Sequence, residues 1–268
     1  MDFKVGLTRD LSNGAGGFSW GEVSIETLAP LPWEFMENAE PFLQPHDFKD
    51  FSAVAFAGVG VSADSFDSPA KSPLVISRFG VGYDNVDLAA CTRAGVALTI
   101  TPDGSKKPVA TAALTLMLAT MFRLVAKDHQ ARTFDWAHRI DGLGSGVNGK
   151  TIGTIGLGNV ASEFFRLISP FETRRLACDP WKKSEEASAI GVELVDLEAL
   201  LSQSDVIVVT AALTPETRHL IGKAQFALMK KSAIIINISR GPLIDEESLV
   251  DALRSGEIAG AGLDVFEV

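Results

Sequence analysis

The sequence predicts an α/β protein whose parallel sheets are covered by helices on both faces. Short apolar runs alternate along the chain with polar segments of helical length, which is the pattern of strands joined by crossover helices. The sequence Gly-Leu-Gly-Asn-Val-Ala at 156–161 joins one such run to the next helical segment. Of the 268 residues, 46% are hydrophobic and 22% are charged, a balance typical of a folded protein.

Charge and composition exclude several classes of partner. The 34 acidic residues outnumber the 24 basic ones, and the formal net charge of −10 repels phosphate backbones. The apolar stretch Leu114–Met121 is shorter than the roughly 18 residues of a membrane span, and the N-terminal residues lack the pattern of a signal peptide. Cys91 and Cys178 cannot build a disulfide framework and show no metal-ligand spacing. We therefore expect a cytoplasmic protein that binds no nucleic acid, membrane or metal.

The N-terminal part of the chain predicts a small parallel sheet. A glycine- and serine-rich loop at 11–21 follows the first apolar run, and a segment of helical length, Val86–Ala94, precedes the last one. The predicted strands are Phe3–Leu7, Ser52–Val59, Leu74–Ile76 and Val96–Ile100.

A polar segment rich in turn formers, Thr101–Pro108, is the predicted domain boundary and divides the chain into residues 1–107 and 108–268. A long helix of about Val109–Thr133 follows the boundary. Because apolar residues cover much of its circumference, we expect this helix to be buried, in part at a subunit interface. A second glycine-rich loop occupies 141–149.

The C-terminal part shows the alternation of strands and helices most clearly, which predicts a second parallel sheet. The predicted strands are Thr151–Ile155, Arg175–Cys178, Asp205–Thr210, Ala233–Ile238 and Ala259–Val265. The predicted helices are Val160–Ser169, Leu197–Leu201, Lys223–Met229 and Glu246–Ser255.

The motif at 156–161 has the spacing of a dinucleotide-binding turn. Gly156 permits a tight turn after the strand, and Gly158 removes a side chain so that backbone N–H groups can approach a pyrophosphate. The helix N-terminus adds partial positive charge, and Ala161 is small enough for close packing of helix on strand. The alternative is a strand-to-helix turn that needs glycine only for its own geometry.

Asp179 ends the next predicted strand and gives the motif a context. A carboxylate at this position can accept hydrogen bonds from both hydroxyls of the adenosine ribose and would repel a 2′-phosphate, so NAD is favoured over NADP. The alternative is a turn residue before Pro180. Four basic residues near in sequence could soften the preference for NAD: Arg174, Arg175, Lys182 and Lys183.

Several long motifs resemble one family. TIGTIGLGNVA (151–161), ACDP (177–180), LTPETRHLI (213–221), ALMKKSAIIINISRGPLIDEESLVDAL (227–253) and IAGAGLDVFEV (258–268) are similar to the nucleotide-binding domain of D-isomer-specific 2-hydroxyacid dehydrogenases, the phosphoglycerate dehydrogenase-like family. SRFGVGYDNVDLAA (77–90) and AGVALTITP (94–102) resemble the family's substrate loop and the strand after it. The resemblance extends from about Leu74 to the last residue. It implies an NAD-binding, Rossmann-like doubly wound sheet at 108–268 and a flavodoxin-like α/β substrate domain whose N-terminal portion is 1–107.

The resemblance assigns roles to individual residues. Asn159 and Val160 would contact the pyrophosphate through their backbone, beside Gly156 and Gly158, and Asp179 would hold the ribose. The adenine and ribose side of the cleft would be lined by Thr210, Ala211, Ala212 and Thr217, and the nicotinamide by Ile238, Ser239, Arg240 and Asp264.

Arg240 is the predicted catalytic residue. The planar guanidinium of this arginine can bind the carboxylate of a 2-oxo acid and polarise its carbonyl group. The alternative is a surface arginine in an ion pair.

The turn at Gly80-Val81-Gly82 resembles the loop whose amides bind the substrate carboxylate, so Val81 and Gly82 are predicted to bind substrate and Arg78 to support them. A glycine-rich turn before a helix capped by Asp84 or Asn85 is the alternative, and Arg78 is nearly as compatible with a plain surface role.

The family completes its site with a Glu and a His beyond the DVF segment, and the sequence reaches only Val268 there. None of the four histidines lies in the Thr-Pro-His motif of the family. We therefore expect a C-terminally truncated, homodimeric, NAD-dependent dehydrogenase that interconverts a D-2-hydroxy acid and a 2-oxo acid. The alternative is a catalytically silent, NAD(H)-binding regulatory protein. Lys106 and Lys107 could attract an anionic substrate or simply belong to a solvated hinge.

Overall fold

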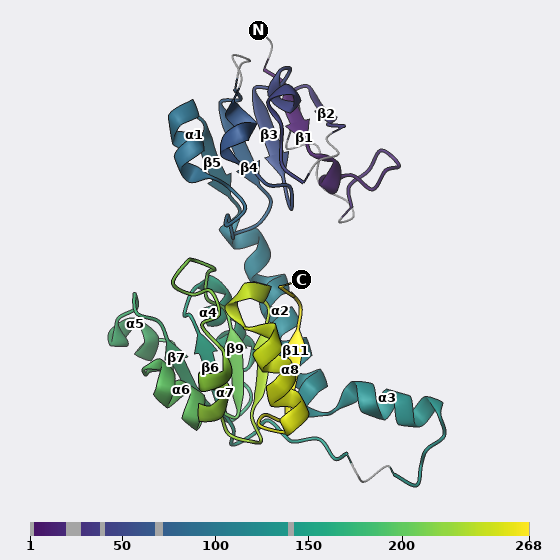
Figure 1. The fold of residues 1–268 in the computed structure, drawn as a ribbon, viewed down its shortest axis with the longest axis vertical. Helices are drawn as coiled ribbons and strands as arrows, with labels where there is room; N and C mark the ends of the chain where they lie inside the picture. The colour runs from purple at the N-terminus through teal and green to yellow at the C-terminus, as the bar shows by residue number, and fades with distance from the viewer. Residues whose placement is uncertain (1–2, 20–27, 38–40, 68–71, 139–141, 268) are drawn as a thin grey trace. The chain divides into compact units, whose positions relative to one another are not determined.

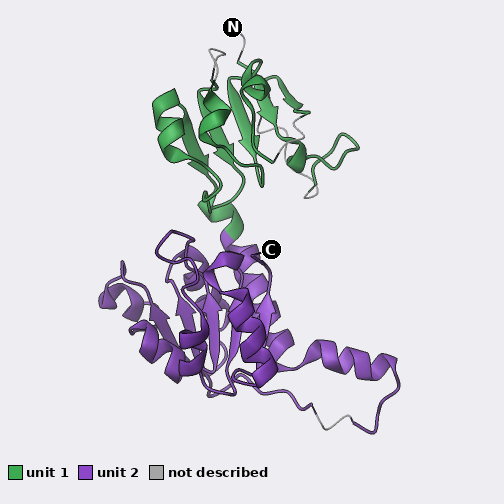
Figure 2. Ribbon diagram, in the orientation of Figure 1, with its two compact units in different colours: residues 1–105 green, residues 106–268 purple. Residues whose placement is uncertain are grey.

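The computed structural model describes residues 3–19, 28–37, 41–67, 72–138 and 142–267. The chain forms two compact units, residues 1–105 and 106–268 (Figure 2). The boundary predicted from the sequence lies after residue 107, and the functions assigned to the two parts remain predictions. Residues 20, 21 and 141 of the two predicted glycine-rich loops lie outside the described residues.

The first unit holds a five-stranded parallel sheet in the order β2-β1-β3-β4-β5. The four predicted strands are confirmed with shifted ends. The sequence does not predict β2, because three residues are too few to show a periodicity. The strands are β1 (Val5–Leu7), β2 (Trp33–Phe35), β3 (Ala53–Phe56), β4 (Val75–Arg78) and β5 (Ala97–Ile100).

Helix α1 (Leu88–Ala94) begins two residues later than the sequence predicts. The Asp87 carboxylate accepts a hydrogen bond of 2.8 Å from the Ala90 amide and caps the helix, and Gly95 ends it with a φ of 68°. The alternative caps, Asp84 and Asn85, are therefore wrong. The described residues of this unit also form the short 3₁₀ helices η1 (Arg9–Leu11), η3 (Pro45–Phe48) and η4 (Ala63–Phe66).

The segment predicted as a polar break is helical. Helix α2 spans Pro102–Met121, so the turn formers at 102–108 occupy its first two turns. Proline at the first helical position loses no hydrogen bond, and Asp103 suits the positive end of the helix dipole. The same residue types occur in turns and in the first turns of helices, which is why the sequence pattern predicts a break where the helix begins.

The predicted long helix is broken in the middle. Arg123 adopts a left-handed φ of 52°, and α3 (Leu124–Arg132) leaves α2 at 58°. One stripe of α2, Ala110, Ala113, Met117 and Met121, is buried, which confirms the expected burial of this half. None of the residues of α3 is buried within the chain, and burial of this half at a subunit interface stays a prediction. In the described ranges, no single helix is long and apolar enough to cross a membrane, and α2 with α3 meets that test only as a bent pair.

The second unit holds a six-stranded parallel sheet in the order β11-β10-β9-β6-β7-β8. Its strands are β6 (Thr151–Ile155), β7 (Arg174–Cys178), β8 (Glu193–Leu194), β9 (Val206–Val209), β10 (Ile234–Asn237) and β11 (Gly260–Leu263). Its further helices are α4 (Asn159–Leu167), α5 (Ser184–Ser188), α6 (Leu197–Gln203), α7 (Lys223–Leu228), α8 (Glu246–Ser255) and the 3₁₀ helix η5 (Gly241–Leu243). The predicted elements are confirmed, and the sequence misses only the short pieces α5, β8 and η5 among them.

Alternate residues of the central strands belong to different cores. Val206 and Val208 pack with residues of α2 and α4 in one core, whereas Ile207 and Val209 pack with residues of α6, α7 and α8 in the other. Helices therefore cover both faces of this sheet (Figure 1). The doubly wound parallel sheet predicted from the sequence is the observed fold.

Candidate cofactor site

Five strands of the second sheet end in one register row. Ile155 lies opposite both Cys178 and Val209, Val209 lies opposite Asn237, and Asn237 lies opposite Leu263. The strand order reverses at β6, whose two neighbours are β7 and β9. In open α/β sheets, ligands bind outside the carboxyl ends at such a reversal. The residues one position beyond the row are Gly156, Asp179, Thr210, Ile238 and Asp264, all of which the sequence assigns to the cofactor site.

Gly156 is required by the turn itself. Its φ is +94°, a conformation that a side chain would strain, and a Cβ there would lie 3.0 Å from the Ala211 nitrogen. The Gly156 amide donates to the Cys178 carbonyl at 2.8 Å and ties the turn to β7. Gly156 therefore fits a turn that needs glycine only for its own geometry as well as a dinucleotide-binding turn. Gly158 distinguishes the two interpretations.

Gly158 has the features that the turn alone does not demand. Its backbone is extended, with φ −88° and ψ −163°, and a Cβ added there would meet no heavy atom within 4 Å. In the described part of the chain, no side chain caps α4, whose first residues are Asn159 and Val160. Open space in front of uncapped N–H groups at a helix N-terminus suits a pyrophosphate. The residues present therefore fit the phosphate portion of a dinucleotide.

The Asp179 carboxylate lies between the glycine turn and the end of β7. One oxygen accepts a hydrogen bond of 2.8 Å from the Leu157 amide, and the other accepts one of 2.9 Å from the Trp181 amide. Asp179 therefore does stabilise the turn before Pro180, as the alternative interpretation states. Each oxygen keeps a second lone pair, which a ribose hydroxyl can use. Burial, and then the neighbouring Asp179 charge, raises the pKa of the Cys178 thiol, which keeps it protonated.

The basic residues near Asp179 in sequence are engaged elsewhere. Arg174 lies at the amino end of β7, about 13 Å along the strand from its last residue, and it pairs with Glu193 at 2.9 Å. The Arg175 Nη2 donates to the Ser169 carbonyl at 3.4 Å, and Lys182 pairs with Glu186 at 3.1 Å. Arg174, Arg175 and Lys182 are therefore bonded to groups other than the Asp179 carboxylate, and the role of Asp179 in selecting NAD stays a prediction.

The ends of β9 and β10 are joined to the glycine turn by hydroxyl groups. Thr210 Oγ1 donates to the carbonyls of Ile155 and Gly156, both at 3.0 Å. Ser239 Oγ donates to the Ala211 carbonyl at 2.5 Å. Thr217 Oγ1 donates to the Ala212 carbonyl at 2.7 Å, so it shapes the loop after β9. These hydrogen bonds tie the predicted lining residues to one another at this edge of the sheet.

A residue that sequence reasoning misses, Asn237, shapes the turn that presents Arg240. The Asn237 side chain is buried, donates to the Arg240 carbonyl at 2.9 Å and accepts from the Ser239 amide at 3.1 Å. Its backbone carbonyl accepts from the Asp264 amide at 2.9 Å. The available signal was a lone asparagine near the end of the apolar run AIIINI. Arg240 is half-buried, and its Nη1 donates to the Ser239 carbonyl at 2.8 Å.

The predicted substrate residues lie in the first unit, after β4. Gly80 has a φ of +149°, and a side chain there would overlap the Arg78 guanidinium, so Arg78 folds over the turn. The Gly80 amide donates to Thr101 Oγ1 at 2.9 Å. Among the described residues, the amides of Val81 and Gly82 have no hydrogen-bond acceptor. Two consecutive N–H groups without an acceptor can receive a carboxylate.

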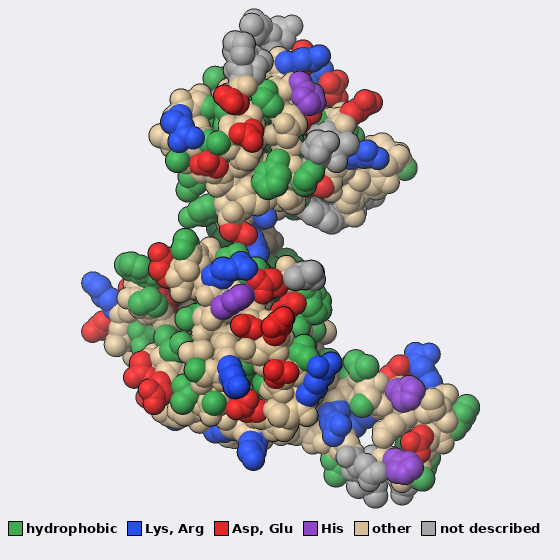
Figure 3. Space-filling model, in the orientation of Figure 1, with side chains coloured by type: hydrophobic (Ala, Val, Ile, Leu, Met, Phe, Trp, Pro, Cys, Tyr) green, Lys and Arg blue, Asp and Glu red, His purple; other side chains and the backbone are tan. Residues whose placement is uncertain are grey.

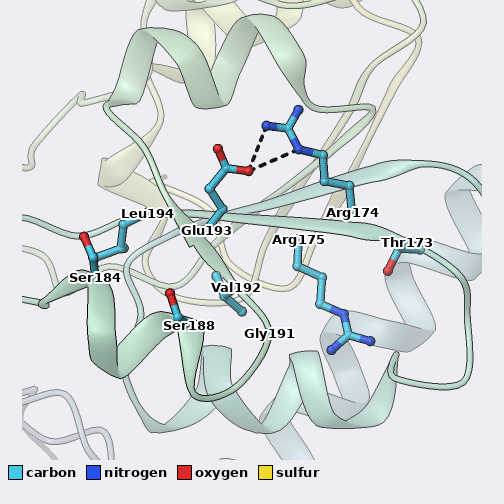
Figure 4. Close-up of a pocket in the computed structure, with 9 residues that line it drawn as sticks. All are labelled: Thr173, Arg174, Arg175, Ser184, Ser188, Gly191, Val192, Glu193 and Leu194. Carbon is cyan, nitrogen blue, oxygen red and sulfur yellow. Dashed lines mark hydrogen bonds and ion pairs between the residues drawn. The ribbon is translucent and has the colours of Figure 1, made fainter.

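A hollow in the second unit lies away from these residues. It has a volume of about 480 Å³ and is lined by residues from the amino end of β7, from α5 and from β8 (Figure 4). The Arg174–Glu193 ion pair lies beside it, and no predicted site residue lines it. In the part of the chain that the structure describes, no group of three or more His, Cys, Asp or Glu side chains is placed to hold a metal ion.

The fold and the strand-end residues define a dinucleotide-binding α/β protein, and comparison with known proteins specifies the class. Residues 114–268 match the NAD-binding domain of the D-isomer-specific 2-hydroxyacid dehydrogenases. The chain belongs to this family, and its cofactor is NAD.

Relatives with established names support the assignment. A glyoxylate reductase of Thermococcus gammatolerans is 41% identical over 213 residues, which are 77% of this chain and 64% of the relative. A D-3-phosphoglycerate dehydrogenase of Archaeoglobus fulgidus is 41% identical over 198 residues, which are 74% of this chain and 37% of the relative. The chain thus matches less than two thirds of the length of these relatives.

Solved structures show the same fold. A glyoxylate reductase from Paecilomyes thermophila is 29% identical, with a TM-score of 0.80, over 100% of this chain and 83% of that one. A D-lactate dehydrogenase from Aquifex aeolicus, solved with NAD and lactic acid, is 25% identical, with a TM-score of 0.83, over 98% of this chain and 77% of that one.

Proposed function

We propose that this protein is an NAD-dependent oxidoreductase that interconverts a small D-2-hydroxy acid and the corresponding 2-oxo acid. The observation that supports it most is the row of strand ends. This row brings the uncapped N-terminus of α4, the Asp179 carboxylate and the turn before Arg240 to one edge of the sheet. The names of the relatives make glyoxylate and other short 2-oxo acids the first substrates to test.

The residues divide the work by chemistry. NAD held at this edge would supply the hydride chemistry of the nicotinamide ring. The N–H groups of Asn159 and Val160 would hold its pyrophosphate, and the Asp179 carboxylate would accept hydrogen bonds from its ribose hydroxyls. Arg240 binds the substrate carboxylate and polarises its carbonyl group, which favours the negative charge that develops on the carbonyl oxygen. In the first unit, the amides of Val81 and Gly82, supported by Arg78, are a candidate binding group for a substrate carboxylate.

Titration with NADH tests the base of this proposal. Trp181 is 91% exposed and lies two residues beyond Asp179, so bound NADH should quench its fluorescence. Saturable quenching followed by oxidation of NADH on addition of glyoxylate is the expected result. A chain that shows no NADH binding at millimolar concentration refutes the proposal.

The second candidate is an NAD(H)-binding protein without turnover. The positions of the histidines favour it: His46 lies in η3, His129 lies on α3, and His219 is turned toward Glu267. Among the described residues of the second unit, no histidine directly follows the carboxyl end of a strand. Measurable reduction of any 2-oxo acid by the purified chain would eliminate this candidate.

We further propose that the protein is a homodimer and that the segment around α3 is its interface. Leu124 and Val125 are 58% and 81% exposed, and α3 lies apart from the sheet of its unit (Figure 1). Further exposed apolar side chains on this segment are Phe122, Phe134, Trp136 and Leu143. Apolar surface of this extent is typical of an interaction site, and a second copy of the same segment would match it. Sedimentation velocity is expected to give twice the mass of the chain.

A further inference from the structure

A charged cluster joins the segment after β11 to the loop before α7. The Glu267 carboxylate contacts the Arg218 guanidinium and accepts from His219 Nε2 at 2.9 Å. The Glu267 amide donates to the Glu246 carboxylate in the first turn of α8. In Figure 3, a histidine on the surface of the second unit is bordered by basic and acidic side chains. Three separate parts of the unit thus meet at Glu267, whose side chain is only 17% exposed.

The segment that Glu267 holds lies directly on the turn after Arg240. A side chain at Gly241 would overlap the backbone of Phe266 and Glu267, so the two backbones are in contact there. The His219 amide donates to the Pro242 carbonyl at 2.7 Å and supports the same turn from another side. The turn that follows Arg240 is therefore enclosed by two segments, and Glu267 bonds one to the other.

His219 is held in an unusual conformation by this arrangement. Its backbone φ is +51°, in the left-handed region that side chains disfavour. Its ring lies between two carboxylates, with Nε2 at 2.9 Å from Glu267 and Nδ1 at 4.0 Å from Asp245. A conformation of this kind persists only where the surroundings fix it. The cluster is therefore a rigid support.

We propose that Glu267 is a positioning residue for Arg240. By bonding Arg218 and His219, it fixes the segment at 264–267 against the turn at Gly241, and this sets the direction in which Arg240 is presented. The inference rests on the proposed function for the role of Arg240, since a carboxylate of a 2-oxo acid is what the guanidinium would meet. In this proposal Glu267 acts through the turn and not by touching the substrate or the cofactor.

Two measurements on Glu267→Ala test the proposal. The first is amide hydrogen exchange of residues 240–244 in the free protein, which we expect to be at least tenfold faster in the variant. The second is binding of oxamate, a 2-oxo acid isostere, to the NADH complex, which we expect to weaken about tenfold while the Kd for NADH stays within twofold. Glu267→Gln, which keeps an acceptor for Arg218, should recover part of both effects. Glu247→Ala removes the same charge from the exposed first turn of α8 and should change neither.

The outcomes separate this inference from the proposed function. Unchanged exchange at 240–244 in Glu267→Ala overturns the inference. So does an equal loss of NADH and oxamate binding together with a lower Tm, because that pattern marks a general structural role. If the wild-type chain binds NADH but no oxamate, the proposed substrate class fails, and the exchange measurement alone decides whether Glu267 fixes the turn.

Discussion

Replacing Asp179 with asparagine tests the cofactor site, because the substitution keeps the shape of the side chain and removes its charge. The Asp179 carboxylate accepts from the Leu157 and Trp181 amides at 2.8 and 2.9 Å, and it would also accept two ribose hydroxyls. Hydrogen bonds to a charged group contribute about 1.5–3 kcal/mol each and neutral ones about 0.5–1.5 kcal/mol. Two ribose contacts therefore lose about 2 kcal/mol together, which is about 30-fold in the Kd for NADH.

The same substitution should narrow the preference for NADH over NADPH, since the carboxylate that repels a 2′-phosphate is gone. Titration of tryptophan fluorescence with each cofactor measures both effects. The matched control is Asp196→Asn, because Asp196 also accepts a backbone amide, that of Ala199 at 2.7 Å, and caps α6. The control should bind NADH as the wild type does. An Asp179→Asn variant whose NADH affinity and cofactor preference equal those of the wild type would refute the assigned role.

Five further substitutions follow from the geometry. Gly158→Ala should leave the Tm unchanged but lower the NADH affinity at least tenfold, because the added Cβ enters the open space before α4. Gly156→Ala should instead lower the free energy of unfolding by about 1–3 kcal/mol, since the φ of Gly156 is +94°. Equal Tm values for the two in thermal melts would contradict this. Arg240→Lys keeps the charge but loses the planar guanidinium, so the KM for glyoxylate should rise far more than the Kd for NADH. An equal rise of the KM and the Kd would contradict the role of Arg240 in substrate binding. Leu124→Asp should give a folded monomer, measured by sedimentation velocity, because it places a charge in the proposed interface. A variant that is still dimeric would show that the interface lies elsewhere. Burial acts to raise the pKa of Asp205, but the Thr151 amide and Lys230 outweigh it and hold that pKa below its usual value. Asp205 therefore stabilises the fold above the unfolded pKa of about 3.9, and this stability is lost as the pH falls through the folded pKa. Asp205→Asn should show a smaller loss of Tm on acidification than the wild type, and an unchanged acid dependence would show that Asp205 contributes none of it.

The parallel sheet of the second unit is predictable because its strands are buried on both faces. Val206 to Val209 and Ile234 to Ile236 are all buried, and such strands appear in the sequence as uninterrupted apolar runs. Edge elements lack this signal. Strand β8 is two residues long, with Glu193 exposed, and nothing in its composition separates it from a loop.

The break between α2 and α3 depends on tertiary structure rather than on local sequence. Apolar residues continue from Met121 through Phe122 to Val125, so the pattern predicts one helix. Only the left-handed backbone at Arg123 separates the buried helix from the exposed one. Arginine is an ordinary helix former, and no residue type marks the position.

The candidate site divides in the same way. Parallel strands align their carboxyl ends, so residues that follow apolar runs gather at one edge, and Gly156, Asp179 and Asp264 were predictable for that reason. The residues that support them were not predictable. Asn237 and Glu267 act through hydrogen bonds to residues brought near by the register of β10 and by the return of the chain after β11. Contacts of this kind depend on the three-dimensional fold and leave no spacing in the sequence.

A crystal structure of the protein in complex with NADH would test the strand-end site directly. The pyrophosphate is expected on the amides of Asn159 and Val160, and the adenosine ribose hydroxyls on the Asp179 carboxylate. A pyrophosphate found instead in the hollow beside Arg174, or a ribose out of reach of Asp179, would contradict the assignment of the cofactor to the row of strand ends.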